Sequence, residues 1–416
     1  MKIVLVGKGG REHALALALA QSPSQPTVFA CPGSEGMADT AIPLTDIADI
    51  AALVRWMQAE HVDLCVAGEE AWLALGLADA CHAAGIPCFG PPQVAAQLES
   101  SKIFAKQFLQ RHQIPTGAFT IADNAEACRA AIHSYPAVLK YNGLAAGKGV
   151  AVCTGPDEVD AFLDMVFTRK AFGEDQVFVE EFLEGKEVSV ICAVSDGQAF
   201  YFTPARDHKR LQDGDLGPNT GGMGAVASRQ LLPPDVVADI QSRIIAPTLE
   251  GLVKDNLRYR GFLYFGIILT REGPKVLEFN CRFGDPEAQA VLPLIEGDFA
   301  QFLLEAAQGT LRPDCIQFHE GWSVCLVMAS RDYPRSSSAG DPISGLDGLN
   351  NSRVYHAGTR RRPDGSFQTN GGRVLAVSAI GDTLAAARDA AYADLQRIHF
   401  DGAQFRRDIG RIHFDT

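Results

Sequence analysis

The clearest group of chemically useful side chains lies near residue 280, where a strand-like run, KVLEFN, ends in polar residues. Because side chains alternate along a strand, Glu278 and Asn280 are expected on one face. Their carboxylate and amide oxygens are hard ligands suited to Mg²⁺, which commonly bridges nucleotide phosphates. If the strand continues, Arg282 falls on the same side, where its guanidinium could stabilise a phosphoryl or acyl-phosphate oxyanion. The alternative is a surface strand end with one salt bridge.

A glycine-rich loop between two strand-like runs forms a second group. It reads Asn142-Gly143-Leu144-Ala145-Ala146-Gly147-Lys148-Gly149. The loop fails the Walker A pattern, because three residues separate its first two glycines and Gly149 stands where Ser or Thr is required. Its small residues could still fold over a triphosphate, and Lys140 could direct its ammonium at the same phosphates. A hairpin that binds no ligand is the alternative.

A third group combines charged residues with glycines. Asp207-His208-Lys209-Arg210 precedes Gly217-Pro218-Asn219-Thr220-Gly221-Gly222-Met223-Gly224. Ordering so many glycines costs chain entropy, which is easier to understand if the backbone must touch a ligand. A solvated charge run followed by a flexible loop is the alternative.

The first strand-like run, KIVLV, is followed by a turn with the sequence Gly7-Lys8-Gly9-Gly10-Arg11-Glu12-His13. The third glycine of a dinucleotide fingerprint would fall at Glu12, which argues against an NAD-dependent oxidoreductase. The glycines could still bring backbone N–H groups to an anion at a helix N-terminus. A tight turn without a ligand is the alternative.

The elements that must position these residues follow from periodicity. Over residues 1–90 strand-like runs alternate with helical ones, including a helix from about Asp46 and another that ends near Ala80, which predicts a parallel sheet with ligands at the carboxyl ends of its strands. Residues 98–114 are expected to form a helical bridge, and 115–183 a compact α+β unit. A glycine-rich loop over 213–224 and a long helix over 235–254 are also predicted.

Composition limits the kind of protein. Hydrophobic residues make up 47% of the 416 residues, and the formal net charge is −13. An acidic surface repels nucleic acid and anionic lipid, so anionic substrates must be held at local basic sites. We expect a cytoplasmic protein with neither a signal peptide nor a membrane span. The ten cysteines stand apart in sequence, which predicts free thiols in the core.

Seven segments together resemble the phosphoribosylamine–glycine ligase (glycinamide ribonucleotide synthetase) family of the ATP-grasp superfamily. They are GGREHA at 9–14, GLAAGKGV at 143–150, DHKR at 207–210, GPNTGGMGA at 217–225, EFNCRFGDPE at 278–287, TNGGRVLAV at 369–377 and RRDIG at 406–410. The resemblance covers essentially the whole chain. It implies an α/β and α+β multidomain protein, with an N-terminal parallel α/β sheet domain (1–98), a central ATP-grasp domain (99–317) whose mobile lid spans about 116–184, and a C-terminal α+β domain (318–416).

The resemblance also implies roles for individual residues. ATP-binding residues are Lys102, Lys140, Gly143, Leu144, Ala145, Ala146, Gly147, Lys148, Gly149, Glu180, Glu181, Phe182, Leu183 and Glu187. Of these, the run 180–183 is expected to form a strand beside adenine, and Glu187 to hold the ribose. Glu278 and Asn280 are the ligands of Mg²⁺ or Mn²⁺. Catalytic residues are Arg282, Lys209 and Asp207. Residues expected to bind phosphoribosylamine and glycine are Gly9, Gly10, Arg11, Glu12, His13, Pro218, Asn219, Thr220, Gly221, Gly222, Met223, Gly224 and Asp285.

The implied reaction joins glycine to 5-phosphoribosylamine through glycyl phosphate, consuming ATP and needing no protein nucleophile. The expected partners are these small molecules, without nucleic acid or membrane, and the chain is expected to act as a monomer. It departs from the family pattern at Lys8, Glu69, Trp72, Tyr141 and Asn142. Two rivals remain: another purine-pathway ATP-grasp ligase that activates bicarbonate or formate, and a non-catalytic ATP-binding protein.

Overall fold

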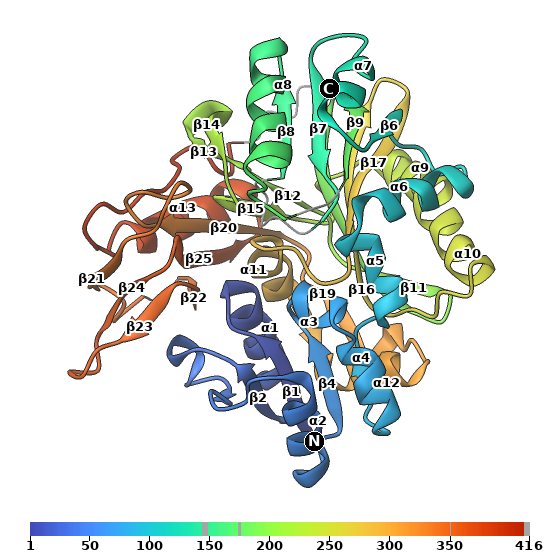
Figure 1. Cartoon of the computed structure of the whole chain (residues 1–416). Helices are drawn as coiled ribbons and strands as arrows, with labels where there is room; N and C mark the ends of the chain where they lie inside the picture. The colour runs from blue at the N-terminus through green and yellow to red at the C-terminus, as the bar shows by residue number, and fades with distance from the viewer. Residues whose placement is uncertain (144–148, 174–175, 350, 412–416) are drawn as a thin grey trace.

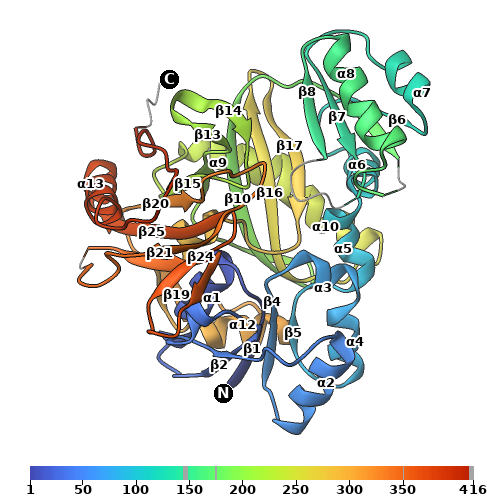
Figure 2. The same cartoon turned by 60° about the vertical axis from the view of Figure 1, so that its left-hand side comes forward.

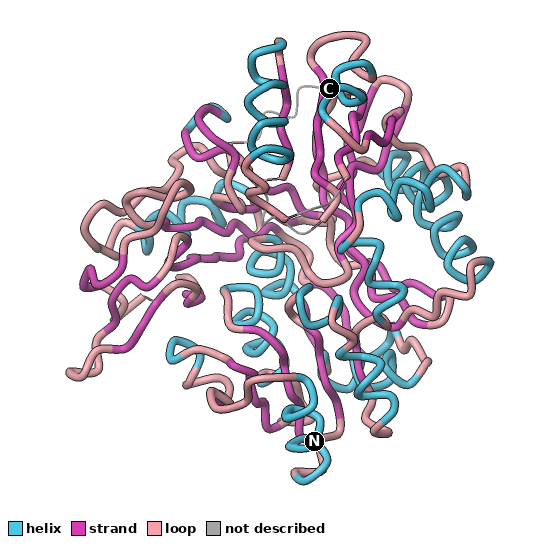
Figure 3. Tube along the Cα trace, viewed as in Figure 1, coloured by secondary structure: helices cyan, strands magenta, loops and turns pink. Residues whose placement is uncertain are grey.

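The computed structural model describes residues 1–143, 149–173, 176–349 and 351–411. Three principal sheets organise these residues: a five-stranded sheet near the N-terminus, a four-stranded sheet, and a nine-stranded sheet that runs through the centre (Figures 1 and 3). None of the helices in the described ranges combines the length and the apolar character that crossing a membrane requires.

The N-terminal sheet is parallel, with the strand order β3-β2-β1-β4-β5, which confirms the predicted fold class. Its strands are β1 (Lys2–Gly7), β2 (Thr27–Pro32), β3 (Ile42–Pro43), β4 (Leu64–Ala67) and β5 (Cys88–Phe89). Its helices are α1 (Gly10–Ala20), α2 (Ile50–Ala59), α3 (Glu70–Ala74) and α4 (Leu77–Ala83). The strand order reverses between β1 and β4, so the turns after these two strands border a crevice where ligands bind in such sheets.

Two predicted helices in this region have different boundaries. The helix expected from Asp46 begins at Ile50, because the Asp49 side chain accepts a hydrogen bond from the Ala52 N–H and caps it. The helix expected to reach Ala80 is two helices, α3 and α4. Gly76 separates them with a φ of +88°, a left-handed conformation that interrupts a right-handed helix.

A helical bridge leads to the second sheet. The bridge comprises α5 (Gln93–Ser100) and α6 (Lys102–Arg111). The antiparallel sheet has the order β6-β9-β7-β8 and consists of β6 (Phe119–Ala122), β7 (Ala137–Tyr141), β8 (Val150–Cys153) and β9 (Val177–Glu181). With α7 (Ala125–Ala130) and α8 (Pro156–Leu163) it encloses its own core and stands opposite the N-terminal sheet in Figures 1 and 2. The predicted strand over 180–183 stops at Glu181, so Phe182 and Leu183 lie beyond it.

The central sheet is antiparallel, with the order β17-β16-β10-β12-β15-β20-β25-β22 and with β11 beside β10. Its strands are β10 (Lys186–Ser195), β11 (Gln198–Tyr201), β12 (Ala205–Asp207), β15 (Gly224–Ala227), β16 (Arg260–Thr270), β17 (Gly273–Asn280), β20 (Trp322–Ala329), β22 (Arg353–His356) and β25 (Arg373–Gly381). Through the β15–β20 pair the sheet continues from the central region into residues after 318.

Both faces of the central sheet are buried, as alternation along β10 shows. Val190 and Cys192 join one hydrophobic core, whereas Ile191 and Ala193 join the other. Full burial of such side chains contributes roughly 1.5–3 kcal/mol for each large residue. The covering helices are α9 (Pro234–Ile240), α10 (Ala246–Lys254), α11 (Glu287–Val291), α12 (Phe299–Gln308) and α13 (Leu384–Leu395). The helix predicted over 235–254 contains a π-helical turn between α9 and α10.

Three small sheets complete the described fold. Their strands are β13 (Arg210–Gln212) with β14 (Leu216–Asn219), β18 (Ile295–Gly297) with β19 (Ile316–Phe318), and β21 (Ala339–Ile343), β24 (Phe367–Asn370) and β23 (Thr359–Arg361). The expectation of a plain loop over 213–224 is therefore wrong: β14 pairs with β13 there, and Gly224 begins β15.

Candidate functional site

The two predicted metal ligands lie at the end of β17. Glu278 and Asn280 are partly exposed, whereas Phe279 between them is buried, as the alternation predicts. With its amide nitrogen donating to Glu99 Oε1 at 3.1 Å, Asn280 keeps its carbonyl oxygen for another partner. The strand thus presents two hard oxygen donors, one from a carboxylate and one from an amide.

Four cations from separate parts of the chain act on Glu278. Lys209, just after β12, has its Nζ 3.9 Å from Glu278 Oε1 and 2.9 Å from Oε2 of Glu187 on β10. Burial alone would raise the pKa of Glu278, but the pKa is lowered by Lys209, Lys140, Lys102 and Arg282. Glu278 is therefore ionised, as a metal-binding carboxylate must be.

Asp207 lies beside this group and titrates near neutrality. Burial and the negative charges of Glu287, Glu187 and Glu278 together raise its pKa to about 7 against the opposing charge of Lys209. Lys209 shows the reciprocal effect, because Asp207, Glu278 and Glu187 outweigh burial and hold its pKa well above the usual range. Asp207 can therefore exchange a proton at physiological pH while Lys209 remains a cation.

Lys140, at the end of the lid strand β7, is held by a buried carboxylate. Its Nζ lies 2.6 Å from Glu180 Oε2, and Lys106 of α6 pairs with the other oxygen of Glu180. Burial lowers the pKa of Lys106 to about 8 despite this pairing. Lys106 also donates a hydrogen bond to Thr116 Oγ1. Glu180 therefore fixes two cations where the lid meets the central region.

Lys106 was not among the residues predicted from sequence. It follows Lys102 by four residues, so a helix brings the two lysines to one face, and that spacing was the available signal. Lys102 Nζ donates to the Gly143 carbonyl at 2.9 Å. The Tyr141 N–H donates to the Gly149 carbonyl at 2.8 Å, which closes the base of the predicted phosphate loop. Its central residues, Leu144, Ala145, Ala146, Gly147 and Lys148, lie outside the described residues.

The two departures from the family pattern after Lys140 have structural partners. Asn142 Oδ1 accepts from the Ile103 N–H at 2.9 Å, next to the start of α6. The Tyr141 hydroxyl donates to the Phe172 carbonyl at 2.9 Å. Both contacts hold the C-terminal end of β7, one to the bridge and one within the lid.

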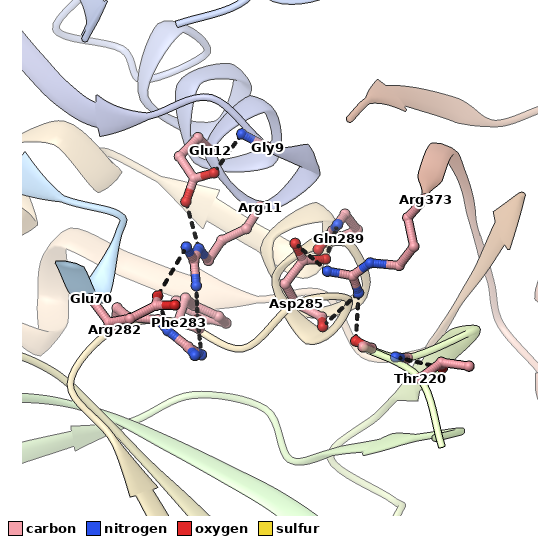
Figure 4. Close-up of polar contacts among 12 residues, drawn as sticks. Gly9, Arg11, Glu12, Glu70, Thr220, Arg282, Phe283, Asp285, Gln289 and Arg373 are labelled. Atoms are coloured by element: carbon pink, nitrogen blue, oxygen red, sulfur yellow. Dashed lines mark hydrogen bonds and ion pairs between the residues drawn. The ribbon is translucent and has the colours of Figure 1, made fainter. Parts of the chain in front are cut away.

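One of the free backbone N–H groups at the start of α1 is paired with a side chain of the same helix. The Gly9 N–H donates to Glu12 Oε2 at 2.7 Å, so a side chain occupies the first amide that was expected to meet a substrate anion. Gly7 makes room for this carboxylate: its φ is +132°, and a Cβ there would lie 2.4 Å from Glu12 Cγ. Arg11 Nε lies 2.5 Å from Glu12 Oε1, and Arg11 Nη2 lies 3.7 Å from Glu70 Oε2 (Figure 4).

His13 connects the N-terminal helix to the last third of the chain. Its Nδ1 accepts from the His356 N–H at 2.9 Å, and its ring stacks on that of His356. Burial lowers the pKa of His13 to about 3. The imidazole is therefore neutral. Its described contacts with His356 support a structural role between α1 and β22.

Arg282 is directed by two carboxylates. The strand does not continue to this residue, because β17 ends at Asn280, so the condition for placing Arg282 by alternation is not met. Arg282 Nε lies 3.1 Å from Glu70 Oε2, and Arg282 Nη2 lies 2.8 Å from Glu99 Oε1. Glu70, next to a position where the chain departs from the family, thus contacts both Arg282 and Arg11 in Figure 4.

Arg373 of β25 organises the glycine-rich segment. Its Nη1 donates to the carbonyls of Gly221 and Asp285 at 2.5 and 2.9 Å, and its Nη2 lies 3.0 Å from Asp285 Oδ2 (Figure 4). Thr220 Oγ1 donates to the Lys209 carbonyl at 2.9 Å. Gly222 has a φ of +107°, and a Cβ there would lie 2.4 Å from Pro286 Cδ, so only glycine permits this approach.

The predicted residues of the 218–224 segment divide into two groups. Pro218 and Asn219 are exposed on β14, whereas Met223 and Gly224 are buried where β15 pairs with β20. Arg373 was missed, although it lies in the C-terminal segment TNGGRVLAV that carries part of the resemblance. An arginine at the start of a strand gives no sign in the sequence that it reaches another domain.

The described side chains therefore form two neighbouring centres. One surrounds Glu278 with the lysines and carboxylates of β10, β12 and the lid, and suits a metal-bound polyphosphate. The other joins Arg11, Arg282, Asp285 and Arg373 at the crevice of the N-terminal sheet, and suits a small phosphorylated or carboxylated molecule. Glu99 links the centres, since it contacts both Asn280 and Arg282.

Comparisons with known proteins match the whole chain. Three family models of phosphoribosylglycinamide synthetase match consecutive segments: the N domain at residues 1–99, the ATP-grasp (A) domain at 100–288 and the C domain at 323–412. The chain is 44% identical to the phosphoribosylamine–glycine ligase of Phenylobacterium zucineum, covering 99% of both chains. It is 42% identical to that of Salmonella typhimurium, covering 99% of this chain and 98% of the relative.

Solved structures agree with these matches. The phosphoribosylamine–glycine ligase of Thermotoga maritima superposes with a TM-score of 0.85 at 32% identity, over 98% of this chain and 100% of the other. A biotin carboxylase from Campylobacter jejuni superposes with a TM-score of 0.71 at 15% identity, over 97% and 92% of the chains, which shows a shared fold alone. Because the three family models match residues 1–288 and 323–412, and relatives above 40% identity cover 99% of the chain, the chain belongs to the phosphoribosylglycinamide synthetase family.

Proposed function

We propose that this protein is an ADP-forming ligase that joins glycine to 5-phosphoribosylamine, giving glycinamide ribonucleotide, ADP and phosphate in purine biosynthesis. The observation that carries the proposal is the ionised Glu278, faced by Lys209 and by lid lysine Lys140 within one site. A metal-binding carboxylate among phosphate-binding cations is what phosphoryl transfer from ATP requires.

Mg²⁺ or Mn²⁺ fits this site. The donors are an ionised carboxylate, Glu278, and an amide oxygen, Asn280, both partly exposed on the same strand face. Such hard oxygen donors select Mg²⁺ or Mn²⁺ over softer cations. When bound, the metal ion would supply charge neutralisation to the phosphates of ATP.

In the first step, the carboxylate of glycine attacks the γ-phosphorus of ATP and forms glycyl phosphate and ADP. Lys140 and Lys102 hold the phosphates, and the 143–149 segment with Glu181, Phe182 and Leu183 encloses the nucleotide. Glu180 keeps Lys140 oriented, and Glu187 serves the ribose. Arg282 stabilises negative charge on the transferred group, which is an electrostatic contribution that needs no protein nucleophile.

In the second step, the amine of phosphoribosylamine attacks the carbonyl of glycyl phosphate, the amide bond forms, and phosphate leaves. The attacking amine must lose a proton. Asp207, whose pKa is raised to about 7 by burial, is suited to accept it. Arg11 with the 217–224 segment and Asp285 positions the two small substrates. We also propose that the protein acts in the cytoplasm, on small molecules and as a monomer.

The test follows ADP release and glycine incorporation while each substrate is omitted in turn, with phosphoribosylamine generated in situ. The expected result is ribonucleotide formation that requires ATP, glycine and phosphoribosylamine together. Bicarbonate and formate should not replace glycine. ATP turnover with either of these carboxylates would preserve the ATP-dependent chemistry but contradict the substrate assignment.

A further inference from the structure

Three cysteines that lie far apart in sequence meet inside the N-terminal sheet domain. Cys65 on β4 and Cys88 on β5 are directly paired in the parallel register, so their side chains leave the sheet on the same face. Cys81 comes from α4, which contacts β5. The three sulfur atoms lie within 4.8 Å of one another. The prediction of free, mostly buried cysteines is confirmed, but these three, which stand apart in sequence, meet in space.

The cluster is enclosed but borders the surface on one side. Cys65 and Cys81 are fully buried, and Cys88 is partly exposed. Among the described residues, no histidine or carboxylate oxygen joins the three sulfurs at comparable distance. The surroundings are apolar, because Cys65 and Cys81 belong to the same hydrophobic core as Leu73 and Leu77.

The arrangement of the sulfurs matches that of ligands around one ion. With bonds of about 2.3 Å from sulfur to the bound ion, three sulfurs around that ion lie roughly 3.3–4.0 Å apart, depending on the angle between the bonds. The three sulfur atoms already lie within 4.8 Å of one another, so each pair must close by at most about 1.5 Å.

We propose that Cys65, Cys81 and Cys88 form a three-sulfur binding site for trivalent arsenic. Arsenite, As(OH)₃, would react with three thiols: three arsenic–sulfur bonds form, three arsenic–oxygen bonds break, and three water molecules leave. The thiol protons leave with the hydroxyl groups as water, and no atom changes oxidation state. The reaction therefore needs no oxidant or reductant.

Charge selects a trivalent ion over a divalent one at this place. Three thiolates around trivalent arsenic make an uncharged complex, whereas three thiolates around Zn²⁺ leave one negative charge. Burying an unpaired charge in an apolar core is costly. Zn²⁺ also favours four ligands, and the described residues supply three.

The test adds one equivalent of sodium arsenite to the full-length protein, reduced with a phosphine, and records its mass under native conditions. Wild type should gain the mass of one arsenic atom less three hydrogens. Cys81→Ala should lose this gain. Cys31→Ala is the matched control, because Cys31 is a fully buried cysteine of the same sheet outside the cluster, and it should bind as wild type does. Binding should also raise the melting temperature of wild type but not of Cys81→Ala.

Three outcomes would overturn the proposal. Wild type that gains no mass has no such site. An equal gain in Cys81→Ala places arsenic on other thiols. Tight binding of Zn²⁺ without binding of arsenite, lost in Cys81→Ala, would assign the cluster to a divalent cation. Cys65→Ala removes a second sulfur of the cluster, from β4, and should also lose the mass gain. With two variants, a folding defect in one of them cannot decide the result.

Discussion

Glu278 shows how single side chains define the proposed reaction centre. Burial would favour its protonated form, but nearby cations keep it ionised, Lys209 having the largest effect. Asp207 has the opposite balance, since burial and neighbouring carboxylates raise its pKa to about 7. Two carboxylates in one site thus have different tasks, one as a permanent anion and one as an acceptor of a proton.

Replacing Glu278 by Gln should reduce kcat by about 100-fold or more, because the change removes the charge that holds the metal ion while keeping the volume. Steady-state rates at saturating Mg²⁺ measure the effect, and the melting temperature should change little. Glu272→Gln is the control, since Glu272 is exposed in the turn before β17. Near-normal turnover of the Glu278 variant would remove Glu278 from the metal site.

Sequence reasoning identified the chemical types in the site better than the contacts between them. Strand alternation correctly predicted that Glu278 and Asn280 share a face. It did not reveal that Glu180 bridges Lys106 and Lys140, because that arrangement joins β9, α6 and β7. Contacts between elements depend on packing geometry, and a single sequence contains no direct record of it.

The junction between α1 and β22 shows how elements are held by a neutral histidine. His13 is protonated in the unfolded chain below its ordinary pKa of 6.5, but burial lowers the folded value to about 3. Below pH 6.5 the unfolded state therefore binds more protons, and stability falls as the pH decreases through this window. At pH 5 the loss from one such group is roughly 2 kcal/mol.

His13→Asn should reduce the loss of unfolding free energy between pH 7 and pH 5 by roughly 2 kcal/mol, since Asn does not titrate and its oxygen can accept the His356 N–H. Urea titrations at both pH values measure the difference. His61→Asn, at an exposed position whose φ of 52° Asn tolerates, should leave the pH dependence unchanged. Equal acid sensitivity of wild type and the His13 variant would show that His13 is not the group responsible.

Arg373 on β25 lies outside the segment 217–224 and holds it in place through Gly221. Arg373→Lys keeps one positive charge but loses the fork that reaches Gly221 and Asp285, so kcat/KM for phosphoribosylamine should fall about 10-fold or more. The apparent affinity for ATP should not change, which distinguishes a local effect from general unfolding. Arg360→Lys, on the exposed strand β23, is the control. Unchanged kinetics in the Arg373 variant would exclude this positioning role.

Element types were predictable where the pattern was long, and boundaries were not. The parallel N-terminal sheet follows from alternation of strand-like and helical runs, and the structure confirms it. The division of one predicted helix at Gly76 depends on a left-handed backbone conformation of this glycine, which the sequence does not specify. The prediction of a loop at β14 is wrong because pairing with β13 overrides the low strand propensity of Gly217 and Pro218.

At the scale of the whole molecule, the central sheet contains strands both from the predicted central domain and from the predicted C-terminal domain. Strands β20, β25 and β22 extend it past residue 318, whereas the lid sheet has its own strands and its own core. The domain boundaries at 98 and 317 remain predictions. The continuity of the sheet nevertheless implies that the C-terminal strands and the lid contribute differently to stability.

A chain that ends at residue 317 should not fold cooperatively, because β15 would lose its partner β20 and α11 would lose the strands β20 and β25 against which it packs. Replacing residues 119–181 by a short linker should leave the remainder folded, since Phe119 and Glu180 are paired neighbours and a linker can span the gap. Calorimetry of both variants measures the contrast. A stable truncated chain, or collapse of the lidless one, would contradict this description.

The central claim, that ATP activates the carboxylate of glycine, can be tested by following an isotope. Glycine labelled with a heavy oxygen isotope in its carboxylate is incubated with the protein, Mg-ATP and phosphoribosylamine, and the released phosphate is analysed by mass spectrometry. Attack of the carboxylate on the γ-phosphorus predicts that each phosphate carries one labelled oxygen. Unlabelled phosphate accompanied by normal ribonucleotide formation would contradict a glycyl phosphate intermediate and the proposed mechanism with it.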